Sequence, residues 1–432
     1  MKRILKNTSY LAVSEALNKV LFLALIILLA RKLDLASFGK YSFALAFFTL
    51  FLQLSDFGLY TFTVRDISRS REKIHKYFGN LFWIRAFASL LVVMMMVLAI
   101  RRISPSADVV ISVYILCGAY LATTMRGQFF SFFLAFQNAK YVAYSRMIHD
   151  VAVVSVAMFF LFSGGSIILI VSSFLAGSLL SLAYSAVVLF ARFGRLNLNL
   201  DFSVCRYILS NSVVFMISNV FSMMLFKIGI LMLSLLKGNA AVGIYNAALA
   251  PVTNLDRVFL LYFSAAFPAM SFLFVTNPQR LVALYKKCYM YLVPAYISVM
   301  VPLLLLSDWI IPLIFGGKFL QSAAVFRILL FAGLFFVMGN INIVMLNAVN
   351  RHVTNAILFA AAASLNIAIN LVLIPRYSFI GAAVSSCISY AFLFITTSAC
   401  VREFCFRNLK AGPVRSVKDI SGKAAGDTEC SR

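Results

Sequence analysis

Long apolar runs separated by short polar stretches dominate the pattern of hydrophobic and polar positions along the chain. Each run is close to the roughly 20 apolar residues that a helix needs to cross a bilayer. The pattern therefore predicts about twelve membrane-spanning helices, in two sets of six. The first set is expected at residues 9–30, 41–60, 78–100, 109–135, 147–163 and 167–191, and the second at residues 208–236, 241–273, 288–306, 323–347, 353–374 and 380–401.

The most polar internal stretch, residues 192–201, lies between the two sets of spans and divides the chain near its middle. We therefore predict an all-α integral membrane fold with one six-helix domain at residues 1–195 and another at residues 196–401. Because six is an even number, both domains enter the membrane from the same side and form parallel repeats. Residues 402–432 are polar and basic, a composition typical of a disordered cytoplasmic tail.

A short sequence occurs once in each half of the chain. The segments Gly39–Ala46 and Gly243–Ala250 both fit the pattern G-x-Y-x-x-A-L-A, and they begin 204 residues apart. Each copy opens the second predicted helix of its own set. This equivalent location indicates that the two halves are duplicates that share one helical scaffold.

The composition supports a membrane protein. Hydrophobic residues make up 62% of the chain and charged residues 12%, so polar residues are too few to cover a soluble protein of 432 residues. The net charge of +24 does not indicate nucleic-acid binding, because the basic residues alternate with apolar runs and accompany no nucleic-acid motif. Lys and Arg are about three times as frequent on one side of the spans, which predicts a multi-pass protein of the cytoplasmic membrane with both termini inside.

The cysteines and histidines show no spacing typical of metal ligands. We interpret the seven cysteines as free thiols, and the three histidines, at positions 75, 149 and 352, as surface residues near helix ends. The sequence therefore predicts no metal site and no organic cofactor.

Several basic residues fall inside predicted spans, where a charge costs at least about 2.5–3.5 kcal/mol at the bilayer centre. At about 1.5 Å per residue, Lys19 and Arg257 lie roughly 15 Å deep, too far from either surface to reach it readily. Arg126 and Arg85 lie roughly 10 Å from the inner surface, and Lys227 lies nearer the outer one. We expect these side chains to line a cleft and to bind an anionic substrate there.

Two acidic residues also lie inside the spans. Glu15 precedes Lys19 by four residues, the favourable order for an ion pair on one helix face. The pair is either a structural ion pair or part of an ion or substrate site. Asp256 and Arg257 diverge by about 100° around their helix, so at least one of them should face a cavity. Glu15 and Asp256 are the candidates for binding a coupling H⁺ or Na⁺.

Pro251 lies inside the same predicted span as Asp256 and should break or kink that helix, because it has no backbone N–H to donate. With Asn246 and Asn254 nearby, such a break at mid-membrane is typical of a transporter binding site, or else of a packing kink. Asn366 and Asn370, one turn apart, are expected to form hydrogen bonds between helices, with contact to the substrate as the alternative.

Several short motifs occur in a fixed order along residues 1–400. They are Ala30-Arg31-Lys-Leu33 with Phe38-Gly39-Lys-Tyr41, Asp56-Phe57-Gly58-Leu59 with Arg65, Val242-Gly243-Ile-Tyr245-Asn-Ala247-Ala248, Phe267-Pro268, Ile314-Phe315-Gly316 with Phe319, and Asn366 to Ser386. In this order and spacing they resemble the polysaccharide (O-antigen) flippases of the Wzx type, within the multidrug/oligosaccharidyl-lipid/polysaccharide (MOP) exporter superfamily.

The resemblance implies two six-helix lobes around a central cleft, as in the MATE and MurJ transporters, and alternating access rather than enzymatic catalysis. It implies that cationic residues hold the diphosphate of a polyprenyl-linked oligosaccharide, and Lys19, Lys227 and Arg257 lie on helices that line this cleft in the superfamily. The implied partners are this lipid-linked cargo, membrane lipids, and the polymerase and glycosyltransferases of surface polysaccharide biosynthesis.

Two other functions stay open at this stage. A cation-coupled multidrug or metabolite exporter of the same superfamily would share the fold, although cationic drugs favour acidic clefts. A membrane glycan polymerase or ligase would need acid–base groups on an outer loop, where residues 307–322 offer Asp308 and Lys318 but no recognisable catalytic constellation.

Overall fold

The computed structural model describes residues 2–403, apart from residues 53–58, 61–62, 65–66, 68–73, 104–105, 195–196 and 350. These described residues fold into helices, and no strand occurs among them. The domain boundary predicted at residues 195–196, the disordered tail, the Asp56-Phe57-Gly58 motif and Arg65 lie outside the described residues, and they stay predictions.

The described helices match the predicted spans. Those of the first half are α1 (Lys2–Lys32), α2 (Leu35–Leu52), α4 (Ile74–Ile103), α5 (Ala107–Ala135), α6 (Ala139–Phe162) and α7 (Ile167–Phe193). Those of the second half are α8 (Phe202–Lys237), α9 (Asn239–Thr276), α10 (Pro278–Leu305), α11 (Ser307–Phe315), the 3₁₀ helix η2 (Gly317–Phe319), α12 (Ser322–Ala348) and α13 (His352–Cys400). Within the described part, nine helices are long and apolar enough to cross a membrane by a joint length and hydropathy criterion. The chain is thus a multi-pass membrane protein.

Helix α13 contains two of the predicted spans. Ser378 has φ 52° and ψ −130°, so the helix breaks there and the chain reverses. The turn is tight, because a Cβ on Gly381 would lie 2.3 Å from the carbonyl oxygen of Leu373. Asn366 in the first half donates to the Ser385 hydroxyl in the second half over 3.2 Å. This is the bond between spans that the sequence predicts, and it ties the two halves into a hairpin.

Local signals in the sequence set the ends of the neighbouring helices. The Asp201 carboxylate caps α8 by accepting from the backbone N–H of Ser203 over 2.9 Å. Asn277 caps α10 by accepting from the N–H of Arg280 over 3.0 Å. Between α8 and α9 the chain turns at Gly238, whose φ of 81° is accessible to glycine at little cost.

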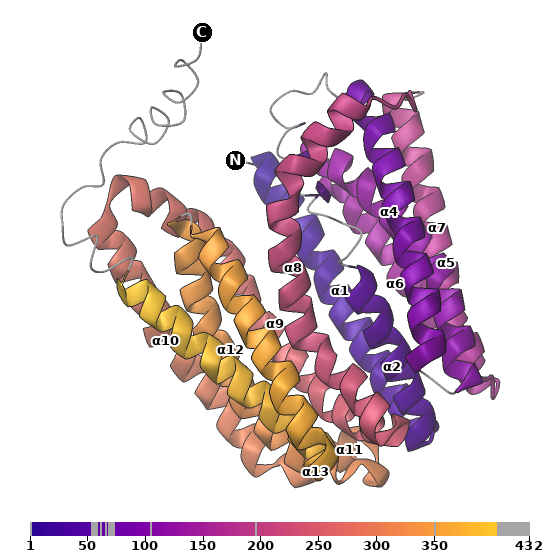
Figure 1. Ribbon diagram of the computed structural model, residues 1–432, viewed down its shortest axis with the longest axis vertical. Coiled ribbons are helices and arrows are strands. Elements are labelled where there is room, and N and C mark those ends of the chain that lie inside the picture. Colours follow the sequence, from indigo (N-terminus) through magenta and orange to yellow (C-terminus); the bar gives the residue numbers. More distant parts are fainter. Residues whose placement is uncertain are drawn as a thin grey trace.

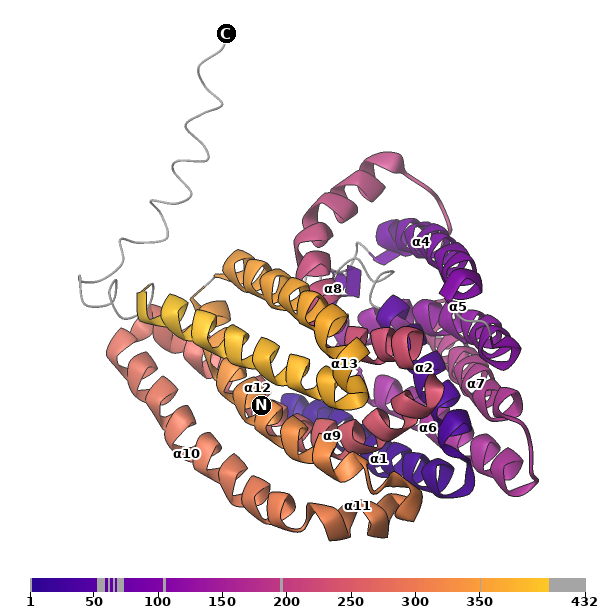
Figure 2. The same cartoon turned by 60° about the horizontal axis from the view of Figure 1, so that its bottom comes forward.

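The helices form two groups (Figure 1). Helices α1 and α4–α7 pack mainly with one another, and so do α8–α10, α12 and α13. Helix α2, which belongs to the first group in sequence, also packs on α5 but lies mainly against α9 and α8 of the second group. Figure 2 shows α1, α2, α8 and α9 between α4–α7 on one side and α10, α12 and α13 on the other. The two groups converge at the end that carries α11 and diverge toward the end where α1 begins and α13 stops. We refer to these as the α11 end and the N-terminal end.

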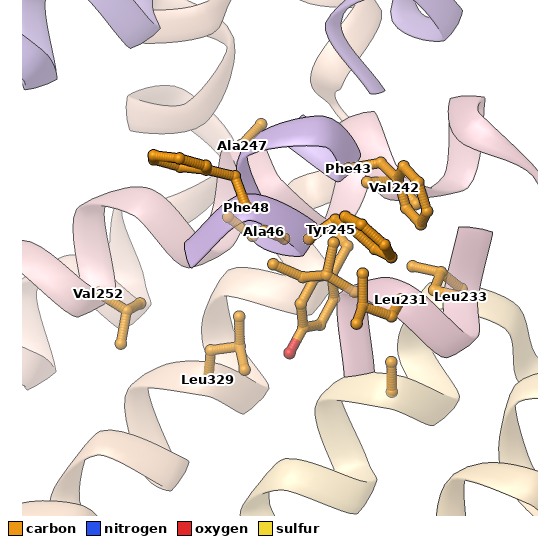
Figure 3. Close-up of a cluster of buried hydrophobic side chains, with 14 of the residues drawn as sticks. Phe43, Ala46, Phe48, Leu231, Leu233, Val242, Tyr245, Ala247, Val252 and Leu329 are labelled. Carbon is orange, nitrogen blue, oxygen red and sulfur yellow. The ribbon is translucent and has the colours of Figure 1, made fainter. Parts of the chain in front are cut away.

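The two copies of the repeated segment meet where the groups converge. A Cβ on Gly39 of α2 would lie 1.6 Å from the carbonyl oxygen of Asn239, and one on Gly243 of α9 would lie 2.5 Å from that of Leu35. Only glycine permits such a close approach of two backbones. Around this crossing, apolar side chains of α2, α8 and α9 form one cluster (Figure 3), which includes Phe43, Ala46, Leu231, Leu233, Val242 and Tyr245.

A second set of contacts closes the α11 end. Arg31, near the end of α1, donates through Nε to the carbonyl oxygen of Ile314 over 2.8 Å and through Nη2 to that of Leu313. In return, Lys318 donates to the carbonyl oxygens of Arg31, over 3.2 Å, and of Leu33. Carbonyls at a helix C-terminus have no partner within the helix and attract cations. Each group therefore supplies a cation that caps a helix of the other, and we call these contacts the reciprocal clasp.

Helix α9 runs from Asn239 to Thr276 without a break, so the broken helix predicted at Pro251 is absent, and the kink predicted as its alternative stays a prediction. The carbonyl oxygen that loses its backbone donor is that of Ala247, four residues before the proline. In membrane helices, neighbouring helices and small local adjustments allow a helix to continue past a proline. Propensity alone predicts a break here, and the packing of α9 against α2 and α12 overrides it.

Candidate functional site

A central cavity of about 350 Å³ lies between the two helix groups. Its walls come from α1, α2, α7, α8 and α9. The polar residues that line it include Asn18, Lys19, Ser42, Thr49, Lys227, Asn246, Asn254 and Arg257. The cavity thus combines several polar groups with apolar walls, which is typical of a binding site.

Three cations from three helices meet in the central cavity. Lys19 of α1 forms an ion pair of 2.5 Å with Glu15, and both side chains are partly exposed. Lys227 of α8 and Arg257 of α9 line this cavity together. No ion pair joins Lys227 or Arg257 to any carboxylate in the described part of the chain. The cavity therefore holds more positive than negative charge, an arrangement that attracts an anion.

An apolar groove of about 570 Å³ runs between α1 and α9 beside this cavity. It shares Lys19, Asn254 and Arg257 with the central cavity. Apart from Glu15, the rest of the groove is lined by aliphatic side chains, and two of them, Val20 and Val258, are 66% and 64% exposed. The groove therefore connects the charged cavity to the outer surface of the helix bundle.

Asp256 lies on the other side of α9, in a cavity of about 220 Å³ inside the second helix group. Lys227 and Arg257 line this cavity as well as the central one. The buried carboxylate accepts a hydrogen bond of 3.1 Å from the Tyr296 hydroxyl. A Cβ on Gly333 would lie 2.0 Å from that hydroxyl oxygen, so the pair needs a glycine behind it. The different directions of Asp256 and Arg257 agree with their predicted divergence around the helix.

Arg126 and Arg85 lie within the first helix group. Arg126 of α5 lines a separate cavity, which we call the N-terminal cavity, and its Nη1 donates to the Ser181 hydroxyl over 2.7 Å. Arg85 of α4 donates to the carbonyl oxygen of Thr124 over 3.3 Å. It lines none of the five cavities described here.

The structure thus brings Lys19, Lys227, Arg257, Asn246 and Asn254 together in the central cavity, and the other predicted residues do not line it. Glu15 lines both the apolar groove and the N-terminal cavity. Pro251 lies on α9 and is absent from the residues that line the central cavity. The grouping of five residues from α1, α8 and α9 follows from the packing of the two helix groups.

Sequence reasoning missed several residues that line these cavities. Ser42 could have been found from the repeat, because it occupies the same position in the first copy as Asn246 in the second. Arg146 lies one residue outside the span predicted at residues 147–163, but α6 begins at Ala139 and carries Arg146 into the N-terminal cavity. The interpretation of His149 as a surface residue was wrong, because its side chain is only 14% exposed and bonds to Asp150.

Residues 4–274 match the model of a family described as polysaccharide biosynthesis protein. The chain belongs to this family. A protein of Methanocaldococcus jannaschii described as an uncharacterized membrane protein is 26% identical over 305 residues, which cover 67% of the chain. The match spans 59% of the length of that relative.

Solved structures of transporters share the fold. An inward-facing MATE multidrug transporter of the MOP superfamily matches with a TM-score of 0.78 at 12% identity, over 94% of this chain and 99% of that one. The lipid II flippase MurJ in an inward closed conformation matches with a TM-score of 0.77 at 14% identity, over 90% of this chain and 87% of that one. An outward-facing MATE structure gives a TM-score of 0.63 at 12% identity, over 93% of this chain and 95% of that one. The protein therefore has the fold of a MOP-type transporter.

Proposed function

We propose that the protein is a flippase that moves a polyprenyl-diphosphate-linked oligosaccharide from the inner to the outer leaflet of the cytoplasmic membrane. The observation that carries this proposal is the set of Lys19, Lys227 and Arg257 in one cavity, of which only Lys19 is ion-paired to a described carboxylate. The family to which the chain belongs supports a role in polysaccharide biosynthesis.

A diphosphate fits the charge of the central cavity. Moving such a group through hydrocarbon without partners is prohibitive, because its charged oxygens lose their water. Lysine and arginine replace part of that water with charge-assisted hydrogen bonds, which are about twice as strong as neutral ones. Asn246 and Asn254, which line the same cavity, offer amide groups to the sugar that follows the diphosphate.

The apolar groove between α1 and α9 suits the lipid part of the cargo. It begins at Lys19 and Arg257 and continues past exposed aliphatic residues such as Val20 and Val258. A polyprenyl chain in this groove would stay in contact with the bilayer while its headgroup occupies the central cavity. The cargo would therefore cross without drawing its tail through the protein.

Alternating access follows from the way the two groups meet. The reciprocal clasp and the α2–α9 crossing hold the α11 end closed, while the groups diverge at the N-terminal end. With the predicted orientation, the cavity opens toward the cytoplasm, where a lipid-linked oligosaccharide is assembled. In this proposal Glu15 and Asp256 bind the coupling H⁺ or Na⁺, glycosyltransferases supply the cargo, and a polymerase uses it.

A cation-coupled multidrug or metabolite exporter is the second candidate. The buried Asp256, in a cavity with aromatic neighbours such as Phe226 and Tyr390, is the observation that favours it. The excess of basic groups in the central cavity argues against a cationic drug. Resistance of cells to cationic dyes when the protein is overproduced would favour this function over the flippase.

A glycan polymerase or ligase receives less support. Asp308 and Lys318, the candidates on the predicted outer loop, already have structural partners. Asp308 forms an ion pair with Arg327, and Lys318 belongs to the reciprocal clasp. Transfer of glycan by the purified protein would be needed to establish this activity.

The flippase proposal is tested in proteoliposomes that contain a lipid-linked oligosaccharide. Outward movement of the headgroup, read by its accessibility to an added lectin, is expected for the wild type. The double variant Lys19→Ala, Arg257→Ala should lose it by at least tenfold, while Arg280→Gln, at the surface near the start of α10, should not change it. Equal translocation by the wild type and the double variant would disprove the proposal.

A further inference from the structure

The N-terminal cavity is a second charged space that the diphosphate does not require. It has a volume of about 220 Å³ and lies among α1, α5 and α6. Helix α1 connects it to the spaces described above, because Asn18 also lines the central cavity and Glu15 also lines the apolar groove. A molecule in the central cavity could therefore extend a substituent past α1 into this space.

Two guanidinium groups line the N-terminal cavity. Arg126 is only 9% exposed, and its Nε has no hydrogen-bond partner among the described residues. Its Nη1 donates to the neutral hydroxyl of Ser181. Arg146 of α6 is 38% exposed and lies at the same cavity. A buried charged donor that lacks a partner is unusual in a folded protein and indicates a missing acceptor.

The carboxylates of the cavity do not supply that acceptor. Glu15 bonds to Lys19 at 2.5 Å and approaches Nη1 of Arg146 only to 3.9 Å. The Asp150 carboxyl is hydrogen-bonded to Nδ1 of His149 over 2.9 Å. No ion pair joins Asp150 to Arg126 among the described residues. Both acids therefore have closer partners than the two arginines.

The two guanidinium groups are also held in place. The Arg126 Cζ atom lies 5.4 Å from the centre of the Phe130 ring, and that of Arg146 lies 5.9 Å from it. Contact with one aromatic ring limits the rotamers of both side chains. Guanidinium groups fixed in this way can bind the paired oxygens of a carboxylate or phosphate without a large loss of side-chain entropy.

We infer that the N-terminal cavity binds a second anionic group of the cargo, a sugar carboxylate or a phosphate substituent, held by Arg126 and Arg146. The inference rests on the proposed function and adds that the transported oligosaccharide is itself acidic. The cavity is smaller than the roughly 300–1,000 Å³ of typical small-molecule sites, so it accommodates one substituent or one sugar rather than the oligosaccharide.

The test uses the full-length protein in lipid nanodiscs and isothermal titration calorimetry. The probes are inorganic pyrophosphate for the central cavity, and sodium glucuronate and inorganic phosphate for the N-terminal cavity, with methyl glucoside as the neutral control. The variants are Arg126→Gln and Arg146→Gln, compared with Arg257→Ala. Arg101→Gln is the matched control, because Arg101 is exposed at the other end of the first group and bonds to Tyr114.

We expect Arg126→Gln and Arg146→Gln to weaken the binding of glucuronate or phosphate at least tenfold and that of pyrophosphate less than threefold. Arg257→Ala should do the reverse, and methyl glucoside should not bind. Stronger binding of glucuronate assigns a uronic acid, and stronger binding of phosphate assigns a phosphate substituent. Because Arg146 is partly exposed, its variant is expected to fold even where Arg126→Gln does not.

Three outcomes would overturn the inference. The first is that neither glucuronate nor phosphate binds the wild type, and the second is that their binding is unchanged in Arg146→Gln and in a folded Arg126→Gln. The third is that every variant weakens the binding of all the anions to the same extent. The proposed function fails separately. If pyrophosphate does not bind while the small anions still depend on Arg126 and Arg146, the diphosphate site is wrong and the N-terminal cavity stands as an anion site.

Discussion

The side-chain amide of Asn246 donates to the hydroxyl of Ser42 over 2.8 Å, and the two residues are 204 positions apart. The same spacing separates the two copies of the repeated segment, so equivalent residues of the repeat bond to each other. Gly39 and Gly243, also equivalent, face each other at the same crossing. The local two-fold relation between the halves therefore passes between α2 and α9.

Removing this bond should weaken the contact between the helix groups. We expect Asn246→Ala and Ser42→Ala each to lower the free energy of unfolding by about 1 kcal/mol, a typical net contribution of a hydrogen bond. Because both remove the same interaction, the double variant should lose clearly less than the sum of the two. Thermal unfolding in detergent measures this cycle, and additive losses would show that the two side chains act independently.

The glycines at the crossing should tolerate no side chain. Alanine at Gly39 would place Cβ 1.6 Å from the Asn239 carbonyl oxygen, and alanine at Gly243 would place it 2.5 Å from that of Leu35. Because both obstacles are backbone atoms, α2 and α9 must separate. We expect Gly39→Ala to reduce folded yield or to open the α11 end, with a smaller effect for Gly243→Ala.

Gly229 provides the control for these two glycines. It lies on α8, where the nearest atoms to an added Cβ are 3.9 Å away. Gly229→Ala should therefore fold as the wild type does and keep its melting temperature within about 2 °C, since it creates no overlap. A Gly39→Ala protein that behaved like Gly229→Ala would contradict the close approach described here.

Breaking the reciprocal clasp should open the α11 end. Arg31→Ala and Lys318→Ala each remove a cation that caps a helix of the other group. With less stabilisation of the closed end, the population should shift toward a state open there. Spin labels at residue 35 and at the exposed residue 320 would report this as a longer or broader distance distribution. The variant Lys32→Ala, in the same turn as Arg31, is the control, and an unchanged distribution in both clasp variants would exclude the role.

Gly333 should be required for the contact between Tyr296 and Asp256. Alanine there would overlap the Tyr296 hydroxyl, so Gly333→Ala and Tyr296→Phe should both leave the buried carboxylate without its donor. We expect the two variants to reduce transport to a similar extent and their combination to add little. Transport rates at fixed pH and Na⁺ check this, and an unaffected Gly333→Ala variant would be evidence against it.

The cap of α2 should depend on pH. Asp34 accepts hydrogen bonds from the N–H groups of Ala36 and Ser37, over 3.0 and 3.1 Å. Hydrogen bonding, chiefly from the Ser37 side chain, lowers the pKa of the Asp34 carboxyl below its usual value of 3.8. Its contribution is thus fully present above about pH 4 and is lost as pH falls through the lower folded-state pKa.

Because the Asp34 carboxyl is largely exposed, its contribution should stay below about 1 kcal/mol. We expect Asp34→Asn to remove the acid-dependent part of the melting temperature and Asp34→Ala to remove the cap as well. Melting curves of the three proteins between pH 3 and pH 7 test this. Identical pH profiles would show that Asp34 is not the titrating group.

The sequence was sufficient for the positions of the spans, because apolar runs of this length have few other uses. It also indicated Lys19 and Arg257 as cleft residues, because a deep charge needs a polar partner or water. The sequence could not predict that Arg126 lies outside the central cavity. Depth along a helix is readable from the sequence, but the direction of a side chain depends on which neighbours pack around it.

Other errors came from local rules that packing overrides. The proline at position 251 indicates a broken helix, yet α9 continues through it, packed against α2 and α12. Arg146 lies outside the span predicted from residue 147, but α6 begins eight residues before that start, about twice the usual error of a predicted helix boundary. That shift moved a cation from the surface to the N-terminal cavity.

The turn at Ser378 has a consequence for how motion could be followed. Gly381 touches the Leu373 carbonyl, and Asn366 bonds to Ser385, so the two halves of α13 cannot slide past each other without breaking both contacts. They should move as a single rigid hairpin. A fluorophore pair at residues 9 and 400, where α1 and this hairpin approach the same face of the membrane, would therefore read the opening of the central cavity directly, without any label inside it.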